Sequence, residues 1–106
     1  MEELLRAIAE PRRRDILRVL RARELSAGEV ASYFELTRPA ISQHLQVLTR
    51  AGLTSVRRQG TRRLYRVRTE GLAELQQFLA EFWDEKLQAL KLAAETEEAR
   101  RRAGDQ

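Results

Sequence analysis

The sequence contains no cysteine and only one histidine among its 106 residues. Without a thiol the chain can form no disulfide, thiolate metal site or cysteine nucleophile. A single histidine also excludes a zinc site built from several histidines of one chain. Because the sequence offers no glycine-rich phosphate loop and no nucleophile with a nearby base, we expect no catalytic residues, no cofactor and no enzyme activity.

Long apolar runs are also missing. No segment approaches the roughly 18 apolar residues of a membrane span, and the N-terminus lacks a signal-peptide layout, so we expect a cytoplasmic protein. The 106 residues, 42% of them hydrophobic, suit one small globular domain with one appended element. The net charge of +4 permits a polyanionic partner without requiring one.

Residues 37–52 carry the most informative pattern. Ile41, Leu45 and Leu48 stand at helical spacing and predict one buried stripe. The other side carries short or planar hydrogen-bonding side chains, of the kind that reach base edges or phosphates in the major groove of DNA. The side chains on this polar side and at the N-terminal end of the helix are Arg38, Pro39, Ser42, Gln43 and Gln46.

Two helices are predicted at the N-terminus. Residues 2–9 and 11–22 carry apolar residues at helical spacing, and Pro11 suits the first turn of the second helix, with Glu10 as its N-cap. Four arginines lie mostly outside the apolar stripe of this second helix, and we interpret them as a solvated face. They are Arg12, Arg13, Arg14 and Arg18.

A third helix is predicted over residues 26–35. Ser26 and Glu29 have the spacing of a capping box, in which each side chain bonds to the backbone N–H of the other residue. A turn of about three residues, 35–37, then leads into the helix capped by Thr37. Two short helices joined in this way form a helix-turn-helix, whose second helix enters the major groove.

The next segment is predicted to form a β-hairpin. Residues 53–58 and 61–68 are rich in β-branched, aromatic and arginine residues, and Gln59-Gly60 is the expected turn. Six arginines occur here, and no acidic residue interrupts residues 54–69. Positive charge protects an exposed sheet edge, but six arginines favour contact with phosphates or the minor groove. The four that we expect to bind DNA are Arg57, Arg58, Arg62 and Arg63.

Residues 72–102 contain no proline or glycine and predict one long amphipathic helix. At 1.5 Å per residue it would extend roughly 45 Å, past a core built from the earlier segments. Its apolar face therefore needs a partner, for which we favour a second copy of the chain; the alternative is that it only covers its own domain. Residues 100–106 are expected to fray. The predicted dimer contacts are Leu4, Leu5, Leu75, Phe78, Leu79, Phe82, Trp83, Leu87 and Leu90.

Several runs together resemble the ArsR-type winged-helix repressors, a family named for regulators of arsenic resistance. These runs are AEPRRRDIL at residues 9–17, LSAGEVA at 25–31, ISQHLQVL at 41–48 with AGL at 51–53, and RRQG at 57–60 followed by LY at 64–65. The resemblance implies a mainly α (α+β) fold, a winged helix-turn-helix with a β-hairpin wing and a long C-terminal dimerisation helix. Residues 1–69 would form the DNA-binding part, and residues 70–106 the dimerisation helix and tail of one integrated domain.

The sequence departs from the metal-sensing members of this family. Those members carry a Cys-x-Cys pair at the start of the scaffold helix, where this chain has Ser-Ala-Gly at residues 26–28, or histidine and aspartate ligands on the terminal helix, where it has no histidine. Three carboxylates there, Glu81, Asp84 and Glu85, could bind a hard cation, although acidic helix faces are usually solvated. The resemblance of residues 82–87 is to a branch with no known metal, so we expect no metal site.

The resemblance implies a homodimer that binds double-stranded DNA and represses transcription at an inverted-repeat operator, usually including its own promoter. Two recognition helices in successive major grooves would require half-sites about 10 base pairs apart, or a multiple of that. We expect Gln43 and Gln46 to read base edges, Arg38 to read guanine or hold a phosphate, and Ser42 to hold a phosphate.

His44 lies on the flank of the predicted buried stripe, so we expect it to pack or to touch a phosphate, and do not expect a pH switch. The sequence leaves open whether a small-molecule effector exists and whether binding represses or activates. An alternative function is a protein–protein interaction module whose long helix docks on another protein.

Overall fold

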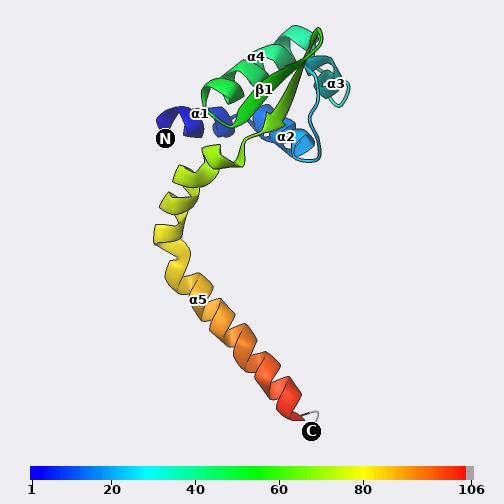
Figure 1. The fold of residues 1–106 in the computed structure, drawn as a ribbon. Helices are drawn as coiled ribbons and strands as arrows, with labels where there is room; N and C mark the ends of the chain where they lie inside the picture. The colour runs from blue at the N-terminus through cyan, green and yellow to red at the C-terminus, as the bar shows by residue number, and fades with distance from the viewer. Residues whose placement is uncertain (105–106) are drawn as a thin grey trace. The chain divides into compact units, whose positions relative to one another are not determined.

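The computed structural model describes residues 1–104, except for the side chains of residues 84–87 (Figure 1). The described chain is mainly helical with one antiparallel hairpin, which confirms the predicted fold class. It divides into two compact units, the first ending at Glu74 and the second beginning at Leu75. The elements in chain order are α1(Glu2–Ala9), α2(Pro11–Leu20), α3(Ala27–Ala31), α4(Arg38–Arg50), β1(Thr54–Gln59), β2(Arg62–Val67), the 3-10 turn η1(Thr69–Leu72) and α5(Ala73–Gly104).

Glu10 separates α1 from α2 and caps the second helix, as predicted. Its carboxylate accepts a hydrogen bond from the backbone N–H of Arg12 at 3.2 Å. α2 ends at Leu20, two residues before the predicted end, because the N–H of Ala22 bonds to a carbonyl only three residues back, at Val19. Such i to i+3 bonds tighten a helix in its last turn.

Two arginines of α2 close the C-terminal end of α1. Arg13 donates hydrogen bonds to the carbonyl oxygens of Arg6 and Ala7, and Arg14 donates to the next two carbonyls, at distances of 2.6 to 3.1 Å. The last four carbonyls of a helix have no partner within it, and positive charge is favourable at that end. The interpretation of these two side chains as part of a solvated face is therefore wrong.

α3 begins with the predicted capping box. The Ser26 hydroxyl accepts from the N–H of Glu29 at 3.2 Å, and the Glu29 carboxylate accepts from the N–H of Ser26 at 3.0 Å. The helix ends at Ala31, earlier than the predicted residue 35. The Ser32 hydroxyl donates to the Glu29 carbonyl at 2.6 Å, and the following N–H groups bond three residues back, so the chain leaves the α-helix. The connection to α4 is correspondingly longer than the predicted turn.

α4 follows Thr37, whose hydroxyl accepts from the N–H of Ala40 at 3.3 Å. This confirms the predicted N-cap. The predicted stripe of Ile41, Leu45 and Leu48 is completely buried. The apolar residues buried with it form the core, which consists of Leu4, Ala7, Ile16, Leu20, Leu25, Val30, Ile41, Leu45, Leu48, Leu53 and Leu64.

The hairpin turns one residue later than predicted. Gln59 lies opposite Arg62 in the register, so the two-residue turn consists of Gly60 and Thr61. Gly60 occupies the first turn position with a φ of +63°, a conformation that glycine adopts without steric cost. The predicted Gln59-Gly60 turn is therefore wrong by one residue.

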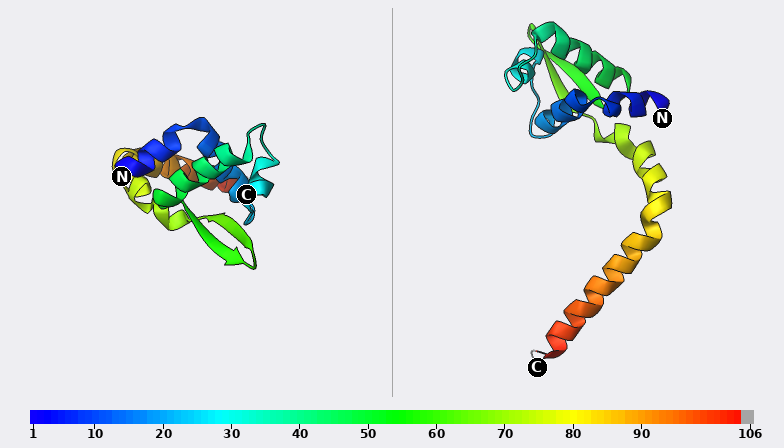
Figure 2. Two further views of the ribbon diagram at one scale, coloured as in Figure 1. Left: turned by 90° about the horizontal axis from the view of Figure 1, so that it is seen from above. Right: turned by 180° about the vertical axis from the view of Figure 1, so that it is seen from behind.

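Two backbone hydrogen bonds attach the hairpin to the segment before α3. Leu25 and Tyr65 exchange them at 3.0 and 2.8 Å, so this segment extends the sheet beside β2. β1 runs beside α4, and the Thr49 and Thr54 hydroxyls are 2.8 Å apart where they meet. From this base the hairpin projects beyond the helices of the first unit (Figure 2).

α5 is a continuous helix over Ala73–Gly104. The expected fraying from residue 100 is wrong as far as Gly104. Ion pairs four residues apart, Arg101 with Glu97 at 3.4 Å and Arg102 with Glu98 at 2.8 Å, support its last turns, since acid followed by base is the favourable order. None of the helices in the described part of the chain combines the length and apolarity that crossing a membrane requires.

Candidate nucleic-acid interface

The polar side of α4 is exposed as predicted. The side chains of Arg38, Pro39, Gln43 and Gln46 are exposed, and that of Ser42 is half-buried. Because the buried stripe anchors the opposite side, this row of side chains is held on a rigid helix and faces outward. The exposed glutamines are thus free to meet a ligand surface.

A polar hollow of about 500 Å³ lies between α4, the start of α3 and the hairpin. It has two lining residues on α4, and three of its lining residues are arginines. We call it the basic hollow. The residues that line it are Ser26, Ala27, Arg38, Ser42, Thr61, Arg62, Arg63 and Tyr65. The fold therefore brings together predicted DNA contacts that are more than 20 residues apart in the chain.

Arg38 extends over the first turn of α3. A methyl group placed on Gly28 would lie 3.9 Å from the Arg38 guanidinium carbon. The guanidinium therefore sits at the wall of the basic hollow, within reach of an anion that enters it.

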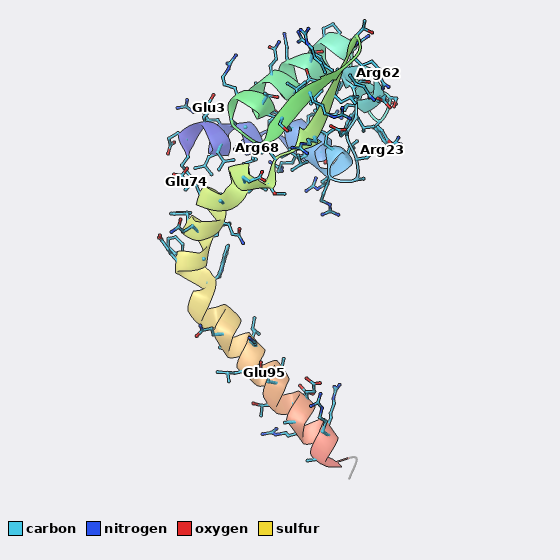
Figure 3. All side chains as sticks on the ribbon, viewed as in Figure 1. Glu3, Arg23, Arg62, Arg68, Glu74 and Glu95 are labelled. Atoms are coloured by element: carbon cyan, nitrogen blue, oxygen red, sulfur yellow. The ribbon has the colours of Figure 1, made fainter. Side chains whose placement is uncertain are left out.

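Arginines follow the hairpin along its length, from Arg62 near its turn to Arg68 at its base (Figure 3). Two of the four predicted DNA contacts have carboxylate partners. Arg57 binds Glu24 through Nε and Nη2 at 2.6 to 2.9 Å, and Arg62 binds Glu29. The sequence analysis missed both ion pairs, and nothing in the local pattern indicates them.

These contacts shift the ionisation of the carboxylates. The hydrogen bond from Arg57 lowers the pKa of Glu24 below its usual value, and Glu24 raises the pKa of Arg57 in return. The pKa of Glu29 is also lowered, first by the backbone N–H of Ser26 and then by its hydroxyl, with a smaller effect of Arg62. Both carboxylates are therefore held in the charged form that binds arginine.

The other two predicted contacts, Arg58 and Arg63, lie directly opposite each other in the register. Within the part of the chain that the structure describes, neither has an ion pair. Like charges placed opposite each other across two strands are destabilising. The pair is thus costly for the isolated protein unless an external anion neutralises it.

His44 is half-buried and faces the N-terminal helices. Its Nδ1 lies 3.5 Å from Nη1 of Arg13, the arginine that closes the end of α1. This contact joins α4 to both N-terminal helices. It favours packing as the role of His44, and its contact with DNA stays a prediction.

The predicted dimer contacts differ in exposure. In the first unit Leu4 is only 5% exposed and belongs to the core, so it has little surface left for a partner, whereas Leu5 is 39% exposed. On α5 the apolar side chains are largely exposed, with Phe82 at 65% and Leu90 at 67%. Leu92, at 63%, was not among the predicted contacts.

Aromatic rings add to the apolar surface of α5. Phe78 and Phe82 meet edge to face with centroids 5.2 Å apart, and Trp83 is 48% exposed. Leu75 and Leu79 are half-buried. Leu87 lies outside the described side chains, as do Asp84 and Glu85 of the acidic set considered above. Among the side chains that are described, no cluster of three potential metal ligands occurs.

Comparisons with known proteins agree on one family. The model of the arsR family of bacterial regulatory proteins matches residues 10–56. The HTH-type transcriptional regulator Rv2034 of Mycobacterium tuberculosis is 44% identical over 77 residues, which cover 73% of this chain and 72% of that protein. The transcriptional repressor SdpR of Bacillus subtilis is 35% identical over 74 residues, covering 70% of this chain and 82% of SdpR.

A solved structure supports the same assignment. The homodimeric winged helix-turn-helix DNA-binding domain of Mb0332 from Mycobacterium bovis has a TM-score of 0.64 and 32% sequence identity. The match covers 79% of this chain and 78% of that one.

Proposed function

The chain belongs to the arsR family of bacterial regulatory proteins and is a transcriptional regulator; from this premise we propose that it is a cytoplasmic, homodimeric repressor that binds an inverted-repeat operator. The basic hollow carries the proposal. It joins the exposed polar side of α4 to hairpin arginines, which are the two surfaces that a winged helix brings to DNA. Since the chain has no cysteine and one histidine, the proposal assigns it no metal.

α4 is the element that reads the sequence in this proposal. Gln43 and Gln46 are exposed on successive turns of its outer side, and glutamine can form paired hydrogen bonds with adenine in the major groove. Each such contact is typically worth about 1 to 3 kcal/mol of base discrimination. Ser42 is half-buried at the wall of the basic hollow, which suits a phosphate better than a base edge.

The basic hollow accounts for how the DNA backbone would be held. With α4 in the major groove and the hairpin at the adjacent minor groove, the strand between the two grooves passes between these elements. Arg38 approaches this strand from α4 and Arg63 from the hairpin, because both line the hollow. Contacts of this kind fix the register of the protein on DNA without reading sequence.

The apolar side of α5 supports a homodimer. Its exposed rings and leucines form the kind of surface that soluble monomers seldom leave uncovered, and the domain of Mb0332, which has the same fold, is described as homodimeric. One α4 reads one half-site, so two copies are needed for an inverted repeat.

Selection of bound duplexes from a random pool tests the proposed function. Full-length protein should enrich an inverted repeat whose half-sites lie about 10 base pairs apart, or a multiple of that. Enrichment of a single half-site would contradict the dimer. A pool without any enriched sequence would contradict sequence-specific regulation. A reporter gene behind the selected site then separates repression, which should lower expression, from activation.

A further inference from the structure

The register of the hairpin divides its four central arginines into two pairs. Side chains alternate between the two faces of a strand, and directly opposed residues share a face. Arg58 lies opposite Arg63 and therefore shares a face with it. Arg57, opposite Leu64, and Arg62, opposite Gln59, point to the other face.

The face of Arg57 and Arg62 is occupied by carboxylates from the segment around α3. Arg57 forms two parallel hydrogen bonds with Glu24, the geometry that gives arginine–carboxylate pairs their orientational specificity. Glu29 receives Arg62 while its carboxylate also caps the first turn of α3. Each strand of the hairpin is thus tied by one ion pair to the scaffold of the helix-turn-helix.

The opposite face has arginines without such partners. Arg58 and Arg63 are exposed, repel each other across the strands, and have no ion pair in the described part of the chain. Arg63 also lines the basic hollow with Arg38 and Ser42. This face supplies the uncompensated charge that phosphates would neutralise.

We infer that the hairpin arginines have two different roles, an inference that rests on the proposed function. Arg58 and Arg63 bind phosphates of the DNA backbone. Arg57 and Arg62 are positioning residues, whose ion pairs with Glu24 and Glu29 fix the orientation of the hairpin relative to α4. The carboxylates are part of the DNA-binding apparatus although they never touch DNA.

A charge swap tests the positioning role. Arg57→Glu alone places two carboxylates together, so it should weaken binding of a selected duplex severalfold. The double variant Glu24→Arg with Arg57→Glu restores an ion pair in reversed order and keeps the net charge of the protein. It should recover affinity close to that of the wild type, with an unchanged slope of log affinity against log salt concentration.

Arg58→Gln and Arg63→Gln are the matched comparison. Each should reduce the steepness of the salt dependence by about 0.9, the contribution of one phosphate contact on duplex DNA. Thermal unfolding of every variant shows whether it is folded. If the double swap binds as weakly as Arg57→Glu and has the shallower slope, Arg57 contacts a phosphate and the two-role assignment is wrong. A wild-type protein that binds no duplex would overturn the proposed function itself, and this inference with it.

Discussion

Gly71 is the residue where the structure leaves no room for a side chain. A Cβ at this position would lie 1.9 Å from the carbonyl oxygen of Gly52 and 2.7 Å from its carbonyl carbon. Both atoms belong to backbone, so no flexible side chain can move aside. Gly52 itself has a φ of +80°, which a residue with a side chain adopts only with strain. The two glycines thus let η1 pass close to the end of α4.

Gly71→Ala is expected to destabilise the protein because the backbone must shift to accept the methyl group. The loss should be about 1 to 3 kcal/mol, the usual range for overpacking, and urea unfolding measures it. Gly28→Ala is the control, since the added carbon would lie 3.9 Å from its nearest neighbour, an ordinary contact. Equal unfolding midpoints for the two variants would contradict the close approach.

Local residue contacts were predictable from the sequence, and distant ones were not. The caps formed by Ser26 and Thr37 join groups three residues apart, so the spacing of the side chains is enough to indicate them. The ion pairs of Arg57 and Arg62 join residues 33 positions apart. No local pattern encodes such a contact, because it depends on how the hairpin folds back onto α3.

At the scale of elements, α3 depends on the ionisation of Glu29. The folded state lowers the pKa of this carboxyl, chiefly through the backbone N–H of Ser26. A lowered folded pKa means that the charged form stabilises the fold at pH values above the ordinary pKa of 4.5. That stabilisation is lost as the pH falls through the lower pKa of the folded protein.

Glu29→Gln is therefore expected to lower the free energy of unfolding at neutral pH but not in acid. The difference from the wild type should stay constant down to about pH 4.5 and shrink below it, because the wild-type side chain also becomes neutral. Urea unfolding across a pH series measures this difference. A gap that widens as the pH falls would show that the carboxylate is not the stabilising form.

The types and order of the elements were predictable, whereas two of their ends were not. Helical and strand periodicities extend over many residues, so α4, α5 and the hairpin were expected close to where they lie. α3 stops early because the Ser32 hydroxyl competes for a backbone carbonyl. The hairpin turn moves by one residue because Gly60 takes its first position, a choice that pairing across the strands decides.

At the scale of the whole molecule, DNA recognition combines three contributions from different segments. The polar side of α4 reads bases, the face of Arg58 and Arg63 holds phosphates, and α5 supplies a second copy of both. The polar side of α4 and the apolar stripe of α5 could be predicted from the sequence. The division of the hairpin arginines required the register and the ion pairs, and so could not be.

The most direct test of the central claim measures how strongly α4 discriminates between sequences. The quantity is the ratio of the dissociation constants for a scrambled and a selected duplex at one salt concentration. Gln43→Ala and Gln46→Ala should each lower this ratio by about tenfold, within the 1 to 3 kcal/mol of one base contact, while affinity for the scrambled duplex stays constant. Gln76→Ala, an exposed glutamine on α5, should leave it unchanged. An unaltered ratio in both α4 variants would contradict the claim that this helix reads the operator.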